Sequence, residues 1–258
     1  MRSLVLFLTS VVSFSATAHT PYLKPFSFEP IAGDRVTLDA SFAEKFFVPE
    51  AAFNSDSFVV ITPSGESVAP ESKVDLKTRT VLEHALPEEG TYRFSTGSRF
   101  GAVFRTYELD GEQRSVRGDE EPIPEGAQVV AHFQSVTKAE AYVSKGAPSN
   151  SVLAAQNSGL EVVPVSHPNS LFAGDAFEFQ VLFNGEPMAN FELNAHHGRD
   201  QFSEDKGITL STDAQGKAVL TAENQGVYLI FARHRAPAPS DAAAPTYSHT
   251  TTLTVEVF

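Results

Sequence analysis

The chain has 258 residues, with 32 acidic against 19 basic side chains, a formal net charge of −13 at pH 7 and no cysteine. Phosphate binding needs a basic stripe and none is visible, so we expect no nucleic acid as partner. Without cysteine there are no disulfides, thiolate metal ligands or thiol nucleophile, and a metal site has to be built from His, carboxylates and the chain terminus.

Residues 1–18 have the features of a secretory signal peptide. Arg2 supplies the positive start, residues 4–14 form an apolar run, and Ala16-Thr17-Ala18 is a small-x-small cleavage site. The run of about 11 residues is shorter than the roughly 20 that a membrane-spanning helix needs. We therefore expect a soluble periplasmic chain that begins at His19. Without Arg2 it has 18 basic and 32 acidic residues, a formal net charge of −14.

Period-two alternation between turn residues predicts β-strands in the first part of the mature chain. The expected strands are residues 35–42, 57–62, 78–84, 91–95 and 101–107. Residues 138–143, rich in Ala and Glu, are interpreted as the end of a long strand. A passage rich in Gly, Pro, Ser and Asn at residues 146–159 then predicts a domain boundary near residue 157.

The second part of the chain shows the same pattern with tight turns, such as Asn184-Gly185 and residues 213–216. The expected strands are residues 160–165, 176–183, 189–196, 208–211, 217–221, 227–234 and 248–258. Seven short strands in about 100 residues predict an immunoglobulin-like sandwich. The expected fold is all-β, with a signal peptide at 1–18, an N-terminal β-sandwich domain at 19–157 and an immunoglobulin-like β-sandwich domain at 158–258.

Several segments of the mature chain have a characteristic sequence: the start at His19 with the aromatic residue and Pro that follow it, and residues 161–169, 173–175, 179–187, 212–216, 226–230 and 247–257. Together they resemble a family of periplasmic proteins that contain a domain of unknown function. Members of this family are often described as periplasmic components of ABC-type cobalt or nickel uptake. The resemblance spans nearly the whole mature chain and is tightest after residue 159. It implies export, a two-sandwich body and metal handling, with an inner-membrane transporter or an outer-membrane receptor as partner.

His19 is the first candidate metal ligand, because cleavage after Ala18 gives it a free α-amino group beside its imidazole. An amine and a ring nitrogen on one residue can chelate Cu(II) or Ni(II), which favour nitrogen donors. The alternative is that a cleavage site happens to precede a histidine.

His234 and His249 form the second candidate. One ends a predicted strand, the other begins the last strand, and a Pro-rich loop at residues 235–247 lies between them. In an antiparallel hairpin their Cβ atoms would lie about 4.5–8 Å apart if the rings share a face. The alternative is that both are solvated residues beside the loop.

The remaining histidines are weaker candidates. His196 and His197 are adjacent in a predicted strand and would point to opposite faces. The acidic loop at residues 200–205 does not match the calcium-loop template. Structural roles are expected for His84, His132 and His167.

The sequence predicts a periplasmic protein that binds nickel, cobalt or copper through His19, His234 and His249 and assists metal uptake or delivery. We expect it not to be an enzyme, because no Gly-x-Ser-x-Gly elbow or His-Glu-x-x-His helix occurs. One alternative is a non-catalytic interaction or adhesion module. Another is a copper enzyme with a histidine brace, resembling polysaccharide mono-oxygenases. It ranks last because those enzymes display an aromatic-rich surface and this chain has no Trp and 6 Tyr.

Overall fold

The computed structural model describes residues 19–31, 34–118, 121–200 and 207–258, so the predicted signal peptide lies outside the described residues. The regular structure in these ranges is built from β-strands, and no α-helix occurs in them. Within the same ranges, no helix is long and apolar enough to cross a membrane. The prediction of an all-β fold is confirmed.

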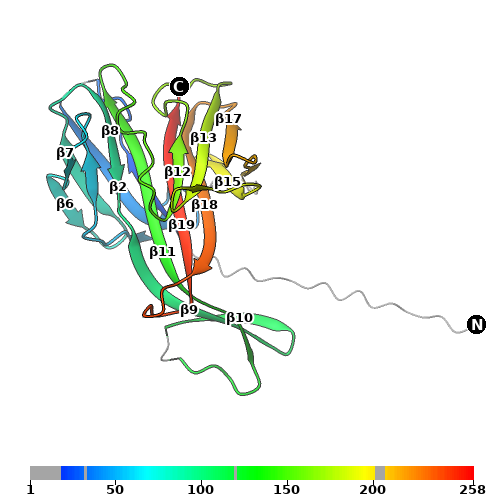
Figure 1. Ribbon diagram of the computed structural model, residues 1–258. Coiled ribbons are helices and arrows are strands. Elements are labelled where there is room, and N and C mark those ends of the chain that lie inside the picture. Colours follow the sequence, from blue (N-terminus) through cyan, green and yellow to red (C-terminus); the bar gives the residue numbers. More distant parts are fainter. Residues whose placement is uncertain (1–18, 32–33, 119–120, 201–206) are drawn as a thin grey trace, which may run out of the picture.

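A five-stranded antiparallel sheet forms one outer layer (Figure 1). Its strand order is β1-β2-β7-β6, and β3 pairs with β2. The strands are β1 (Thr20–Pro25), β2 (Arg35–Ala43), β3 (Ala51–Ala52), β6 (Ser72–Asp75) and β7 (Thr80–Ala85). Alternate residues of β7 are buried, as expected for a strand with one face on a core.

A ten-stranded sheet runs through the whole molecule in the order β16-β15-β18-β19-β11-β8-β4-β5, and β9 pairs with both β11 and β10. The strands are β4 (Val59–Ile61), β5 (Ser67–Val68), β8 (Gly90–Ser95), β9 (Arg99–Leu109), β10 (Glu112–Arg117), β11 (Gln128–Lys145), β15 (Glu192–His197), β16 (Ile208–Ser211), β18 (Gly226–Pro237) and β19 (Thr246–Val257). A four-stranded sheet contains β12 (Leu160–Pro164), β13 (Ala176–Phe183), β14 (Glu186–Pro187) and β17 (Lys217–Thr221).

Strand β11 is the centre of the large sheet. It pairs with β8 and β9 on one side and, in parallel, with β19 on the other. Every other pairing among the described strands is antiparallel. The sheet therefore includes strands from both sides of residue 157, and the domain boundary near that residue stays a prediction.

The two largest hydrophobic cores among the described residues lie against different parts of this sheet. One packs β2, β7 and β8 around Leu38, Leu82 and Phe94. The other packs β13 and β17 against β18 and β19 and includes Phe179. Tyr142 belongs to the second core and its neighbour Val143 to the first, because successive residues of a strand point to opposite faces. The chain thus has a sandwich arrangement on each side of β11.

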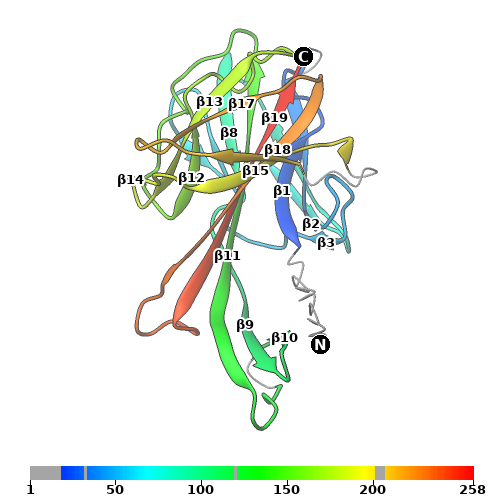
Figure 2. The same ribbon diagram turned by 90° about the vertical axis from the view of Figure 1, so that its right-hand side faces the viewer.

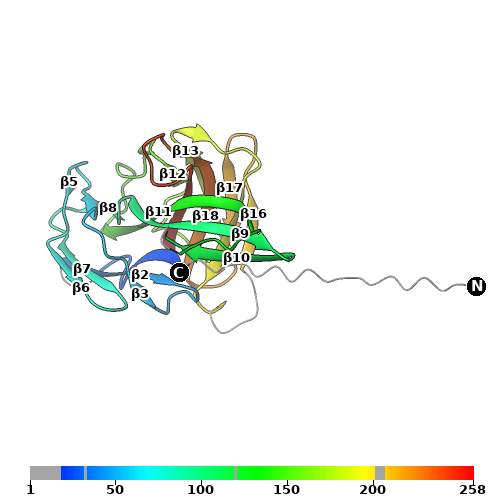
Figure 3. The ribbon, with the colours of Figure 1, turned by 90° about the horizontal axis from the view of Figure 1, so that it is seen from below.

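An arm formed by β9, β10 and the first half of β11 projects beyond the cores (Figures 1 and 2), and β9 and β10 lie in front of the sandwiches in the view from below (Figure 3). Its side chains are mostly exposed or half-buried, whereas the second half of β11 is buried. Phe104 and Phe133 stack across the arm with ring centroids 5.5 Å apart. The guanidinium of Arg235 lies 4.2 Å from the Phe133 ring centroid, so the end of β18 supports the base of the arm.

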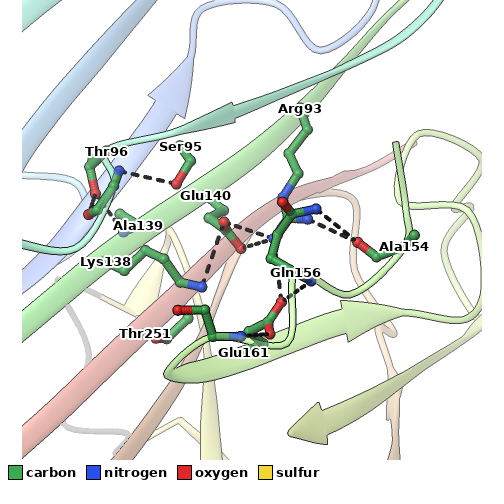
Figure 4. A network of polar contacts seen from close by, with 12 residues as sticks. Arg93, Ser95, Thr96, Lys138, Ala139, Glu140, Ala154, Gln156, Glu161 and Thr251 are labelled. Atoms are coloured by element: carbon green, nitrogen blue, oxygen red, sulfur yellow. Dashed lines mark hydrogen bonds and ion pairs between the residues drawn. The ribbon is translucent and has the colours of Figure 1, made fainter. Parts of the chain in front are cut away.

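A buried charge network joins the two sandwiches (Figure 4). Arg93 on β8 donates to both carboxylate oxygens of Glu140 on β11, at 2.9 and 3.0 Å, and also to the carbonyl of Ala154, at 3.1 Å. Glu161 on β12 accepts from the backbone N–H groups of Gln156 and Ser158 and lies 3.9 Å from Arg93. Arg93, Glu140 and Glu161 are at most 3% exposed. The network therefore fixes the segment that links β11 to β12 against β8 and β11 on one side and against β12 on the other.

Removing the Arg93 charge should destabilise the fold strongly, because Glu140 would remain buried without its hydrogen-bonded partner. We expect Arg93→Met to lower the free energy of unfolding by about 3–5 kcal/mol in urea denaturation. The matched control is Arg114→Met, whose partner Glu112 is exposed, and it should leave the free energy of unfolding nearly unchanged. Equal losses in the two variants would contradict a joining role for the network.

Candidate functional site

The pairing of β1 with β2 places His19 beside an acidic loop. Thr20 pairs with Ala43, the last residue of β2. Glu44, the next residue along the chain, therefore lies opposite His19. The loop returns to β2 at Glu50, whose N–H donates to a β2 carbonyl at 3.0 Å. The register of one hairpin thus brings an imidazole and two carboxylates to the same edge.

The carboxylate of Glu50 is oriented by two contacts. Its Oε1 accepts from the backbone N–H of Glu44 at 3.0 Å, and its Oε2 lies 2.8 Å from Nδ1 of His19. One donor atom from each of the three residues lies within 4.8 Å of the other two, and all three residues are exposed. Ligands about 2.1 Å from a metal and at right angles to each other are about 3 Å apart. His19, Glu44 and Glu50 are called the His19 cluster below. Their donor atoms are close enough together to bind one shared ion.

His234 and His249 are direct partners in the antiparallel hairpin of β18 and β19. Both rings lie edge-on to Phe183, with centroid distances of 4.8 and 5.1 Å. Neither imidazole forms a hydrogen bond with any residue that the structure describes. Burial lowers the pKa of both rings, and for His249 the charges of His234 and Lys138 lower it further, to about 4. The two rings are therefore neutral at pH 7.

The structure does not bring His19 together with this pair. Thr251, on the same face of β19 as His249, donates to the carbonyl of Leu160 at 2.7 Å. Thr252 points to the other face and donates to the carbonyl of Pro21 at 3.0 Å. Strand β1 and His19 therefore lie across the large sheet from His249, since neighbouring strand residues face opposite sides. A single ion cannot bind all three predicted ligands.

The other histidines lie in separate places. A ring nitrogen of His197 lies 3.0 Å from the carbonyl of Gln225, and His196 packs on Phe46 at 5.4 Å between centroids. His167 bonds Thr91 and Ser149, and His84 is buried against two aromatic rings. Glu204 and Asp205, from the acidic loop noted in the sequence, lie outside the described residues.

Glu44 and Glu50, the two carboxylates grouped with His19, were not predicted from the sequence. A signal was available, because in an antiparallel hairpin the start of a strand that follows His19 lies opposite the end of the next strand, which Glu44 follows. The position of Glu50 depends on how the intervening loop folds back, which alternation does not encode.

The family model described as "Domain of unknown function (DUF4198)" matches residues 16–236. No curated protein matches the chain. Among solved structures, the D0-D1 domain of intimin is 15% identical with a TM-score of 0.23, covering 91% of this chain and 97% of that one. The titin domains z1z2 in complex with telethonin are 14% identical with a TM-score of 0.20, over 94% and 98% of the two chains. The Bacillus anthracis TIE protein is 8% identical with a TM-score of 0.19, over 94% and 42%. At TM-scores this low, no conclusion on function follows.

The lowered pKa of His249 should make stability depend on pH. An unfolded histidine takes up a proton near pH 6.5, whereas His249 in the folded chain stays neutral until about pH 4. The contribution of neutral His249 to the free energy of unfolding is therefore complete above pH 6.5 and is lost as the pH falls toward 4. When the pH falls from 7 to 5, the free energy of unfolding measured by urea denaturation should decrease less for His249→Gln than for the unchanged chain. An NMR titration that gives His249 a pKa of 6.5 or higher would contradict this assignment.

Proposed function

The chain belongs to the DUF4198 family, and we propose that this member captures a divalent transition metal ion and delivers it without catalysing a reaction. The observation that carries the proposal is the His19 cluster, in which an imidazole and two carboxylates place donor atoms within 4.8 Å of one another. Imidazole nitrogen suits nickel and copper, and carboxylate oxygens supply the negative charge that a divalent ion requires.

Signal-peptide cleavage after Ala18 would add a fourth donor. The α-amino group of His19 would then lie on the same residue as the imidazole, and the two nitrogens could chelate the ion held by Glu44 and Glu50. This donor set, with two nitrogens and two oxygens, favours copper or nickel over calcium and magnesium, which prefer oxygen ligands.

The exposure of all three cluster residues supports exchange of the ion with a partner. We propose a periplasmic location, and an inner-membrane metal transporter or an outer-membrane receptor as the partner. Protons compete with metal for the imidazole and the amine, so affinity is expected to fall in acid.

A non-catalytic interaction module is the second candidate, and the arm favours it. Phe100, Val129 and Val130 are 57%, 47% and 44% exposed there. Exposed apolar side chains of this kind are common at protein contacts.

The metal site can be tested on the chain that begins at His19, with the amino terminus verified by mass spectrometry. We expect calorimetric titration with nickel, cobalt, copper and zinc to give one-to-one binding of at least one ion. Glu50→Gln and His19→Ala should each lower the affinity by more than about 10-fold. An added Ser before His19 should have a similar effect, because it moves the amine away from the imidazole.

Two matched variants make this titration specific. Glu112→Gln removes an exposed carboxylate of the arm, and His249→Gln removes a predicted ligand on the far side of the sheet. Both should leave the affinity unchanged. Failure of all four metals to bind would refute the proposal and leave the interaction module.

A further inference from the structure

A cavity of about 340 Å³ lies where the arm meets the second sandwich. Its floor is the parallel pair β11 and β19, in which Val136 pairs with His249 and Lys138 with Thr251. Its walls come from the start of β9, from the turns that begin β12 and end β13, and from the Pro-rich loop after β18. The cavity is thus a groove built by segments from both halves of the chain.

Aromatic rings line this groove in a continuous row. Phe100 meets Tyr247 with centroids 5.4 Å apart, Tyr247 meets His249 at 5.9 Å, and His249 meets Phe183 at 5.1 Å. All four residues line the cavity, and Phe100 is 57% exposed. Aromatic side chains arranged in this way can pack edge-to-face or face-to-face against the ring of a flat aromatic ligand.

Among the described residues that line the groove, Lys138 alone carries a charge. Its Nζ lies 3.8 Å from Glu140, beyond hydrogen-bonding distance, and Glu140 already accepts two hydrogen bonds from Arg93. No residue that the structure describes accepts a hydrogen bond from the Lys138 ammonium group. Lys138 is thus ion-paired with Glu140 at 3.8 Å, but its N–H donors stay available at the floor of a groove whose described lining residues include no carboxylate.

The same features oppose a metal ion at His249. A divalent cation there would have two neutral imidazoles, no anionic ligand among the lining residues and the charge of Lys138 close enough to lower the pKa of His249. Imidazole nitrogens without a protein partner can instead donate to, or accept from, a polar group of an organic molecule.

We propose that this groove binds a small aromatic carboxylate, with its ring beside Phe100 and Tyr247 and its carboxylate accepting hydrogen bonds from Lys138 and His249. The ring supplies apolar contact, and the carboxylate gains a charge-assisted hydrogen bond in a partly desolvated site. The size of the cavity is in the usual range for small-molecule sites. The site is distinct from the His19 cluster and does not depend on metal binding.

The test uses metal-free protein in EDTA and three probes: benzoate, benzamide and acetate. Chemical-shift titration should show benzoate binding at least about 10-fold more tightly than benzamide, which lacks the charge, or acetate, which lacks the ring. Lys138→Met should abolish the preference for benzoate over benzamide. Phe100→Ala should weaken both aromatic probes.

Phe172→Ala is the matched control, because Phe172 is 61% exposed and lies outside the groove lining. It should leave all three affinities unchanged. Phe100 is a surface residue, so its variant tests the site even if Lys138→Met does not fold. The proposal is overturned if benzoate does not bind, or if Phe100→Ala and Phe172→Ala bind it equally well.

Discussion

The buried contact of Arg93 with Glu140 is the constraint on which the rest of the molecule depends. The side chain of Arg93 leaves β8 on the face opposite the first core and reaches the linking segment at Ala154. Charges taken out of water are tolerated only where partners and hydrogen bonds replace the solvent. Glu161 meets this need by accepting hydrogen bonds from two backbone N–H groups. The need to keep all three buried charges partnered therefore fixes how one sandwich packs on the other.

The shared strand β11 also decides where the two candidate sites lie. One face of β19 meets β12 and forms the floor of the aromatic groove, whereas the other face meets β1 and thus the side of His19. Two sites on opposite faces of one sheet can have different chemistry. Around His19 there are exposed carboxylates, and around His249 there are aromatic rings and an ammonium group.

Local pattern predicted much of this structure, because strands and turns depend on neighbouring residues. Residues 138–143 are the end of a long strand, as expected, and His234 faces His249 across the predicted hairpin. The parallel pairing of β11 with β19 was not predictable, since it joins residues more than a hundred positions apart. For the same reason the sequence did not reveal that Lys138 lies near His249. The short strand β6 was also missed, because its residues 72–75 are largely exposed and show no clear alternation.

The pairing of β11 with β19 also has a consequence for the order of folding. Residues 133–141 have their edge partners at residues 246–254, and Pro21 has a hydrogen-bond partner at Thr252. During synthesis, one edge of β11 has no partner strand until β19 has been made. A mixed β-protein with such distant contacts folds slowly, because the loop must close before the contacts stabilise it. The open edge of β11 is in that interval a surface on which a chaperone, or another copy of the chain, can pair.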